Sequence, residues 1–140
     1  MKIAVILVRG TVNVTKTIKD TLTMLKLSRK NTCVVVENTP TTMGMIKKAK
    51  DYITWGEISE DTFKELVAKR GQEWQGRTQD SKKKYSYKTL EVAGKKYKPF
   101  FRLNPPSKGF GRKGIKMPFK LGGALGPRAD KINDLIMRML

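Results

Sequence analysis

The sequence predicts an α/β (α+β) protein: an open two-layer sandwich, in which two helices cover one sheet, followed by a helical and basic extension. Short apolar runs rich in β-branched residues alternate with helically periodic segments up to Gly56, in the order strand, helix, strand, helix, strand. The 140 residues are 39% hydrophobic, which is enough to bury the core of one compact domain. Residues 104–127 contain six glycines and four prolines, which predict a long loop.

The first strand and the first helix occupy the start of the chain. The run Ile3–Val8 is continuous, apolar and β-branched, and Arg9-Gly10 closes it, so a buried strand is predicted. From Thr15 onward, apolar residues recur at a spacing that places them on one helical face: Ile18, Leu22 and Leu25. This spacing predicts an amphipathic helix.

A second strand and a second helix follow the turn at Ser28–Asn31. The segment Thr32–Val36 is rich in β-branched residues and predicts a strand that buries Cys33. Thr39 is a typical N-cap, and Pro40 suits the first helical position because an N–H there would have no intrahelical partner. The inward face of this helix is predicted to contain Met43, Ile46 and Ala49.

The third strand, Tyr52–Trp55, completes a core domain predicted over residues 1–58, and residues 59–140 form the extension. The extension opens with a helix over 59–70, capped by Ser59. Its apolar face contains Phe63, Leu66 and Val67. Two helices connecting three strands in so short a chain predict one sheet with both helices on the same face.

The rest of the extension has weaker periodicity. Residues 72–98 predict an irregular basic segment with one strand near Thr89–Val92, and Phe100–Leu103 predicts a short strand. The basic Gly/Pro loop 104–127 follows, and then a C-terminal helix over 130–140. The apolar face of that helix contains Ile132, Leu135, Ile136 and Met139, so it is expected to dock on the body and to hold the far end of the loop.

The charge indicates a polyanionic partner. The net charge is +18, from 30 Lys+Arg and 12 Asp+Glu, and residues 82–128 contribute +13 of it. Each cation that neutralises a phosphate releases counterions, which makes nucleic acid the first partner to consider. A membrane surface is not expected, because the basic stretch has neither an amphipathic helix nor a lipid anchor beside it.

Residue types with catalytic or metal-binding chemistry are scarce. The sequence has no histidine, and its single cysteine cannot form an internal disulfide, which fits a reducing compartment. No Walker-type loop, GxSxG motif or paired cysteines at metal spacing occur. The protein is therefore predicted to be no enzyme, with no cofactor, metal or small-molecule substrate.

Candidate RNA-binding residues fall into three groups. The first follows the first strand, where side chains extend from a rigid support, and the second lies at the end of the second helix. An ordinary solvated turn and a solvated helix end are the simpler interpretations of these two. The third group lies in and beside the basic loop, whose simpler interpretation is a disordered linker. The candidates are Arg9, Thr11, Asn13 and Thr15; Lys47, Lys48 and Lys50; and Arg102, Asn104, Lys108, Arg112, Lys113, Lys116, Lys120 and Arg128.

Apolar residues interleave the charges of the basic stretch, which a bare linker seldom requires. They are Phe100, Phe101, Phe110, Ile115, Met117 and Phe119. Aromatic rings there are able to stack on bases, as in single-strand recognition. The more frequent role of such residues is to anchor a loop in the core, and the sequence favours that role.

Longer stretches resemble one family. The segments MKIAVILVRGTVNV, TKTIKDTLTMLKLSRKNTCVVVENTP and TTMGMIKKAKDYITWGEIS resemble the large-subunit ribosomal protein family L thirty, called protein L seven in eukaryotes. The first fifty-odd residues resemble the part shared with bacterial members. The third helix and FRLNPPSKGF…GRKGIKMPFKLGGALG resemble the archaeal and eukaryotic extension. The first strand begins without the long basic arm of eukaryotic members, so an archaeal-type chain is expected.

The resemblance implies a ferredoxin-like core, attachment to large-subunit ribosomal RNA and no enzymatic activity. The family's first-strand turn falls on Val8–Gly10, its second-helix signature on Thr39, Pro40 and Gly44, and its GIKMP-like loop on Gly114–Pro118. Met117 departs from the histidine that members often have there. A structural constituent of the large subunit is expected, in the cytoplasm and bound to the ribosome. Further candidate partners are 5S RNA and neighbouring ribosomal proteins.

Two other function classes compete with this interpretation. Basic charge alone does not distinguish structured RNA from duplex DNA, so the alternative is an architectural DNA-binding protein. Among enzymes, Val8–Val12 after the first strand faintly resembles the phosphate turn of acylphosphatases. Such an enzyme has no use for a long basic loop.

Overall fold

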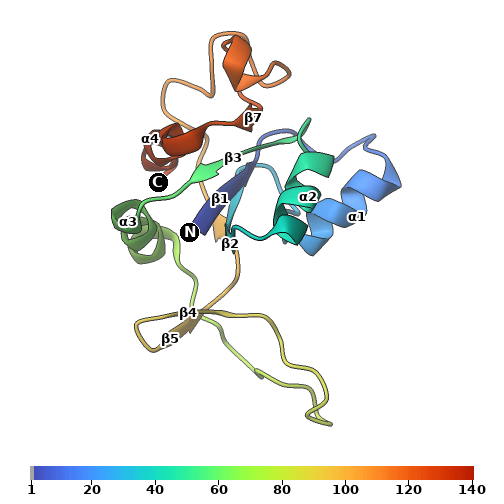
Figure 1. Ribbon diagram of the computed structural model, residues 1–140. Coiled ribbons are helices and arrows are strands. Elements are labelled where there is room, and N and C mark those ends of the chain that lie inside the picture. Colours follow the sequence, from blue (N-terminus) through green and yellow to red (C-terminus); the bar gives the residue numbers. More distant parts are fainter. Residues whose placement is uncertain (1) are drawn as a thin grey trace.

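A five-stranded sheet forms the centre of the computed structural model, which describes residues 2–140 (Figure 1). In spatial order its strands are β6 (Phe101–Arg102), β2 (Thr32–Glu37), β1 (Lys2–Leu7), β3 (Ile53–Glu57) and β7 (Gly126–Pro127). The predicted α/β class is confirmed, and so is the predicted order of strands and helices through the third strand.

The strand register determines which connections meet. β1 is antiparallel to both β2 and β3, so it ends where they begin, with Ile6 opposite Cys33 and Leu7 opposite Ile53. β6 is antiparallel to β2 and ends at the same place, because Arg102 lies opposite Thr32. We call this the loop end of the sheet, since residues 104–127 leave the sheet there.

One face of the sheet is covered by α1 (Lys16–Met24) and α2 (Pro40–Lys48), as predicted. Alternate residues of β1 point to this face, and their burial against Leu22 and Ile46 removes apolar surface from water. The predicted cap is also present: the Thr39 side chain accepts a hydrogen bond from the Thr42 N–H at 3.2 Å.

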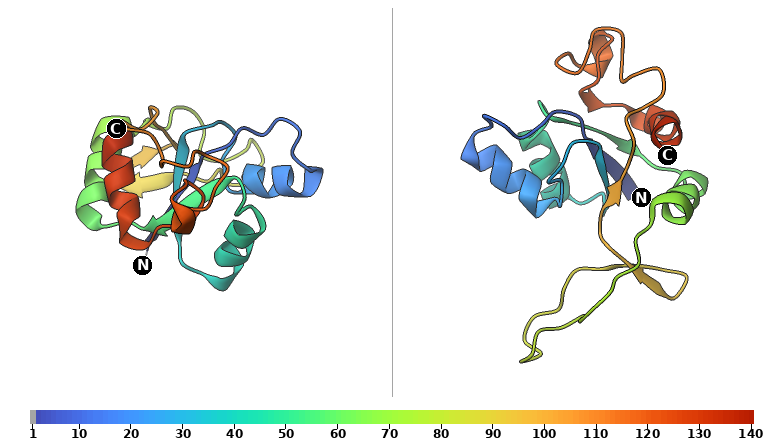
Figure 2. Two further views of the ribbon diagram at one scale, coloured as in Figure 1. Left: turned by 90° about the horizontal axis from the view of Figure 1, so that it is seen from above. Right: turned by 180° about the vertical axis from the view of Figure 1, so that it is seen from behind.

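The extension covers the opposite face of the sheet, so the two-layer core gains a third layer (Figure 2). This layer consists of α3 (Glu60–Arg70) and α4 (Ile132–Met139), which pack on Ala4 and Ile6 of β1. Ser59 caps α3 by accepting from the Thr62 N–H at 3.3 Å. Because β1 is buried on both faces, its sequence is continuously apolar rather than alternating.

Several short elements lie where the sequence predicted irregular structure. Residues 72–98 contain two strands, β4 (Leu90–Val92) and β5 (Lys95–Tyr97), and only the first was expected. Ala93 and Gly94 turn the chain between them with φ of 51° and 79°. The hairpin escapes prediction because its strands are charged and exposed, so they have no apolar alternation.

The predicted loop 104–127 contains a 3₁₀ turn, η1 (Phe119–Leu121), and the whole of β7, which is parallel to β3. The Thr54 hydroxyl donates to the Gly126 carbonyl at 2.9 Å and fixes this pairing. The α-helix of the C-terminal segment begins at Ile132, after a second 3₁₀ turn, η2 (Ala129–Lys131). Such pairings depend on contacts between distant residues, which local periodicity does not encode.

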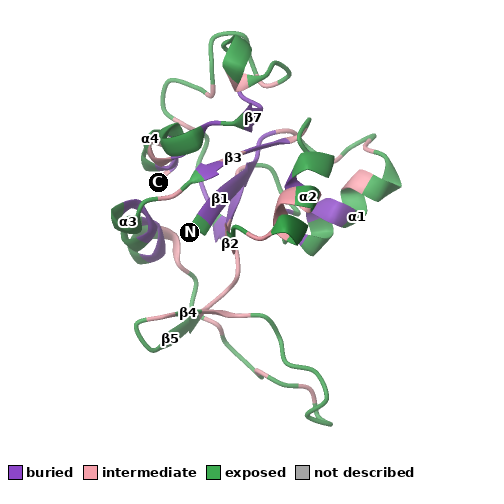
Figure 3. Ribbon diagram, viewed as in Figure 1, coloured by how far each residue is buried: buried purple, intermediate pink, exposed green. Residues whose placement is uncertain are grey.

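Two projections leave the body in opposite directions (Figures 1 and 2). The hairpin arm, residues 72–98, extends beyond β4 and β5, and the basic loop, residues 104–127, extends beyond β7. The arm is exposed or half-buried along its whole length, whereas the basic loop has a buried base (Figure 3). The basic stretch 82–128, continuous in sequence, is therefore divided between two ends of the molecule.

Candidate nucleic-acid interface

Arg9 lies directly beyond β1, at the loop end of the sheet. Its Nη1 donates to the Asp51 carbonyl oxygen at 3.2 Å, and its guanidinium lies 4.9 Å from the centroid of the Tyr52 ring. Within residues 2–140 it forms no ion pair. Because Arg9 is oriented by a carbonyl and a ring rather than by a carboxylate, its charge is not neutralised and its remaining donors are available to phosphate.

The connection from β1 to α1 presents the other predicted residues of the first group. Asn13 and Thr15 are exposed and Thr11 is half-buried. Asn13 adopts a φ of 61°, a left-handed conformation that asparagine tolerates well. Thr15 occupies the N-cap position of α1 but makes no side-chain cap hydrogen bond, so its hydroxyl has no helix partner to lose on binding.

Lys50 and Lys116 are brought together by the fold although they are far apart in the sequence. Both line a hollow of about 250 Å³, along with Trp55 and Pro127. Lys47 and Lys48, in the last turn of α2, are exposed and lie just before Lys50 in the chain. They also offset the negative end of the helix dipole, so their position has a structural explanation as well.

The basic loop is anchored by apolar residues at its base. Ala124 and Leu125 pack with Val8, and Phe110 and Ile115 pack against this cluster. The loop also bonds to itself: the Phe119 N–H donates to the Leu125 carbonyl at 2.6 Å. Most of the interleaved apolar residues are therefore anchors, as the sequence favoured.

Five predicted cations of the loop lie outside this anchored base. They are Lys108, Arg112, Lys113, Lys116 and Lys120, all exposed. None of the four ion pairs within residues 2–140 uses them. A compact base with charged, unpaired side chains around it is suited to following a phosphate backbone.

Arg128 does not belong with the other candidates, because the structure places it inside the protein with only 4% of its surface exposed. Its Nε donates to the Thr54 hydroxyl at 2.9 Å, and its Nη2 donates to the carbonyls of Phe110 and Ala124 at 3.1 and 3.2 Å. Burial, reinforced by Arg138, lowers the pKa of Arg128 to about 10, so the side chain stays charged at neutral pH. Arg128 ties the basic loop to β3, and we remove it from the proposed RNA contacts.

Arg102 and Asn104 are exposed on a backbone that is fixed on both sides. Arg102 is paired with Thr32 in the sheet, and its guanidinium lies 5.4 Å from the centroid of the Phe100 ring. The Asn104 N–H donates to the Met139 carbonyl at 3.0 Å. Both side chains thus extend from rigid positions at the loop end.

Comparisons with known proteins agree with the fold. Residues 3–53 match the family described as ribosomal protein L30p/L7e. Large ribosomal subunit protein uL30 of Nanoarchaeum equitans is 47% identical, over 98% of this chain and 97% of its own. Its counterpart in Methanopyrus kandleri is 44% identical, over 94% of this chain and 99% of its own. The chain belongs to the uL30 family. These relatives are archaeal, which confirms the expected archaeal-type resemblance.

Metal-binding clusters and membrane-spanning helices are both absent among the residues that the structure describes in this uL30 family member. Residues 2–140 contain no group of three or more His, Cys, Asp or Glu side chains able to hold a metal ion. No helix among them is both long and apolar enough to cross a bilayer.

Two groups of cations were missed by the sequence interpretation of this uL30 chain. Arg29 and Lys30 are exposed in the turn before β2, so they also lie at the loop end. The only signal for them was their place in a turn beside a strand. Lys82, Lys83 and Lys84 are exposed in the hairpin arm, where their charge was counted but no site was assigned.

Acidic residues gather at the opposite end of the sheet. Glu37 and Glu57 lie at the ends of β2 and β3, and Glu60 and Asp61 begin α3 just beyond. Asp51 is at the loop end, but its carbonyl, not its carboxylate, holds Arg9. The charge of the body is therefore separated along the strands.

Proposed function

We propose that this chain is a structural constituent of the large ribosomal subunit, and that it binds and stabilises large-subunit ribosomal RNA with the loop end of its sheet. The observation that carries the proposal is the convergence, from segments distant in sequence, of cations that form no ion pair within residues 2–140. Arg9, Lys50 and Lys116 come from three such segments. The names of the archaeal relatives support the ribosomal setting.

The proposed mechanism is contact with phosphate and recognition of RNA shape, rather than reading of bases. Lysine and arginine side chains neutralise phosphates, and hydroxyl and amide groups between β1 and α1 add hydrogen bonds that set the register. The major groove of an RNA helix is too narrow for side chains to read, so a surface of this kind follows the backbone. The proposed contacts are Arg9, Thr11, Asn13, Thr15, Lys47, Lys48, Lys50, Arg102, Asn104, Lys108, Arg112, Lys113, Lys116 and Lys120.

Salt-dependent binding tests the proposal. Purified protein is titrated with large-subunit RNA at several salt concentrations, and the logarithm of the association constant is expected to fall linearly with the logarithm of salt. Equal affinity at low and high salt would contradict a phosphate-based interface. Competition with duplex DNA distinguishes the architectural alternative, which predicts that DNA displaces RNA efficiently.

Paired substitutions locate the interface. Lys50→Gln with Lys116→Gln is expected to reduce the salt slope by about 0.9 for each lost duplex contact. Lys64→Gln with Lys69→Gln removes the same charge from exposed positions on α3 and serves as the control. Equal loss in both double variants would mean that only net charge matters and that the loop end is not the interface.

The basic loop is further proposed to become more ordered on RNA, because its exposed cations form no ion pair within residues 2–140 and repel one another until phosphate neutralises them. Limited proteolysis of the free and the RNA-bound protein measures this, and equal cleavage in residues 104–127 would refute it. Crosslinking within the assembled subunit identifies the RNA helices contacted, and whether 5S RNA and neighbouring proteins are among the partners.

A further inference from the structure

The hairpin arm has a defined fold of its own at its tip. Asp80 Oδ1 accepts hydrogen bonds from the backbone N–H groups of Lys84 and Tyr85, at 2.8 and 3.3 Å. The Asp80 N–H donates to the Tyr85 carbonyl at 3.0 Å, and Lys83 adopts a φ of 55° between them. The tip is thus a closed turn that presents its lysines in a fixed order.

The stem of the arm is held by backbone pairing and by aromatic contact. The Tyr87 N–H donates to the Thr78 carbonyl at 2.9 Å, and the Trp74 N–H donates to the Lys96 carbonyl at 2.8 Å. The Trp74 and Tyr87 rings pack with centroids 6.1 Å apart. The stem therefore has backbone and aromatic contacts of its own, and Leu90, Val92 and Tyr97 pack against the core where the arm meets the body.

Two tyrosines of the arm, Tyr85 and Tyr87, have side chains that are exposed to solvent. The exposed fraction is 74% for Tyr85 and 51% for Tyr87. The hydroxyl of neither forms a side-chain hydrogen bond within residues 2–140, and only Tyr87 has an aromatic neighbour. A planar ring held in solvent beside cations is a surface on which a nucleobase stacks.

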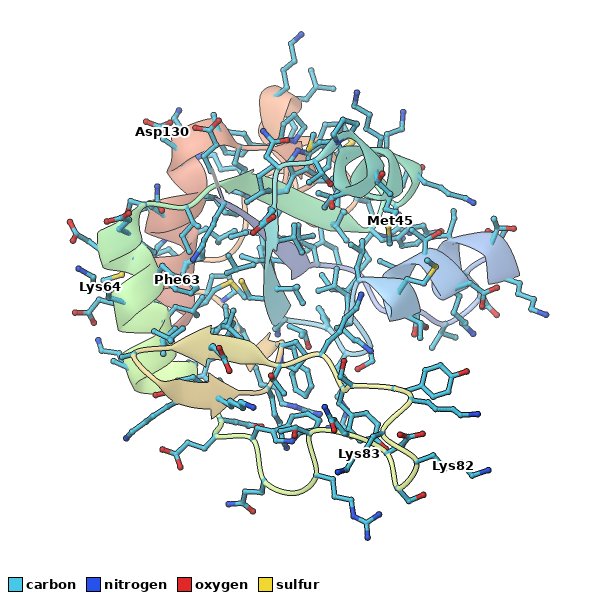
Figure 4. The ribbon with its side chains drawn as sticks, turned by 60° about the horizontal axis from the view of Figure 1, so that its bottom comes forward. Met45, Phe63, Lys64, Lys82, Lys83 and Asp130 are labelled. Carbon is cyan, nitrogen blue, oxygen red and sulfur yellow. The ribbon has the colours of Figure 1, made fainter. Side chains whose placement is uncertain are left out.

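Ion pairs of the arm are confined to its stem within residues 2–140. Lys95 pairs with Glu73 at 3.6 Å and Lys96 with Glu91 at 3.8 Å, and these pairs lie at the stem. Nearer the rings, no ion pair within residues 2–140 involves Lys82, Lys83, Lys84 or Lys88. Figure 4 labels Lys82 and Lys83 at the tip, on the far side of the arm from the sheet. The charge and the exposed rings thus occupy the same part of the arm.

We propose that the hairpin arm is a second RNA-binding surface, which binds an unpaired RNA strand by stacking bases on Tyr85 and Tyr87 and by holding phosphates with Lys82, Lys83 and Lys84. The arm and the basic loop project in opposite directions (Figure 1), so the chain joins two separate RNA segments. The proposal rests on the proposed function. An unpaired strand is favoured over a helix because bases within a helix are already stacked and do not offer their faces to a ring.

Photo-crosslinking of the full chain on large-subunit RNA tests this inference. A photoreactive group placed at Tyr87 is expected to mark unpaired nucleotides, and one placed at Lys113 in the basic loop is expected to mark a different RNA segment. Crosslinks from both positions to one segment would refute the joining of two segments. Crosslinks from the arm to protein alone would refute RNA binding by the arm.

Matched variants separate the stacking from the charge. On the RNA fragment marked by the arm, Tyr85→Ala with Tyr87→Ala is expected to lower affinity at least tenfold, since each stacked base contributes on the order of 1–3 kcal/mol. Tyr85→Phe with Tyr87→Phe keeps both rings and is expected to keep the affinity. An unchanged affinity of the alanine variant, or an equal loss in the phenylalanine variant, would overturn the stacking role.

The contribution of the lysines has its own control. Replacing Lys82, Lys83 and Lys84 with Gln is expected to weaken the salt dependence on that fragment, whereas replacing Lys19, Lys64 and Lys69 with Gln is not. If variants of the arm bound RNA normally while variants of the basic loop did not, the arm would not be a second RNA-binding surface, and the proposed function would still hold. If the unaltered chain bound no large-subunit RNA, the proposed function itself would be wrong.

Discussion

Replacing Arg128 with methionine separates a structural arginine from a phosphate contact. The guanidinium is buried and donates to the Thr54 hydroxyl and to the carbonyls of Phe110 and Ala124. Methionine retains most of the apolar stem, so packing is largely kept. The two carbonyls lose their donor, and each orphaned buried acceptor costs about 1–3 kcal/mol. We expect the free energy of unfolding to fall by roughly 2–4 kcal/mol, since the methionine also avoids the desolvation of a buried charge.

Urea denaturation followed by circular dichroism measures this loss, and RNA titration over a range of salt supplies the second readout. The Arg128→Met variant is expected to keep the salt slope of the unaltered chain, because no phosphate contact is removed. Lys113→Gln, a change at an exposed position of the same loop, is expected to leave stability unchanged and to reduce the slope by about 0.9. Unaltered stability of Arg128→Met together with a reduced slope would refute the structural role.

Three further predictions concern packing, burial and the arm. Gly56→Ala places a Cβ against the backbone carbonyl oxygen of Ala129 and 2.8 Å from the Cβ of Ile132, and it is expected to cost about 1–3 kcal/mol in thermal unfolding. Gly44→Ala, in open space on α2, is expected to stabilise by about 0.5–1 kcal/mol. Burial raises the pKa of Cys33 to about 12, so iodoacetamide at pH 8 is expected to modify the thiol only on unfolding. Because the folded state keeps the thiol protonated while the unfolded state ionises it, the free energy of unfolding is expected to fall as pH rises from about 9 toward about 12. Asp80→Ala is expected to expose the arm tip to protease without changing the Tm; a lowered Tm would show that the arm supports the core.

The core was predictable because its elements carry local signals. β1 is continuously apolar since both of its faces are covered, and α2 begins with the cap and proline that its first turn requires. The helix capped by Ser59 is equally well marked. In each case the sequence signal that marks the element lies within the element or a few residues from it.

The site was predictable only in part, because its arrangement depends on distant contacts. Sequence reasoning named Lys50 and the cations of the basic loop as separate groups, but it did not predict that the fold brings Lys50 to Lys116. It also wrongly placed Arg128 among the RNA contacts, because nothing in the local sequence distinguishes a buried arginine from an exposed one. The division of the basic stretch into two projections follows from β6, which was predicted as a short strand but whose pairing with the distant β2 local sequence does not encode.

Both edges of the sheet are closed by strands of two residues, β6 on one side and β7 on the other. Very short edge strands offer few unpaired backbone groups, and Pro127 in β7 has no N–H to donate to another strand. β6 pairs with Thr32 and Cys33 of β2, and β7 pairs with Thr54 and Trp55 of β3, so each covers part of the outer edge of a longer strand. A chain shortened to residues 1–58 would leave the outer edges of β2 and β3 wholly unpaired, so it is expected to self-associate through them.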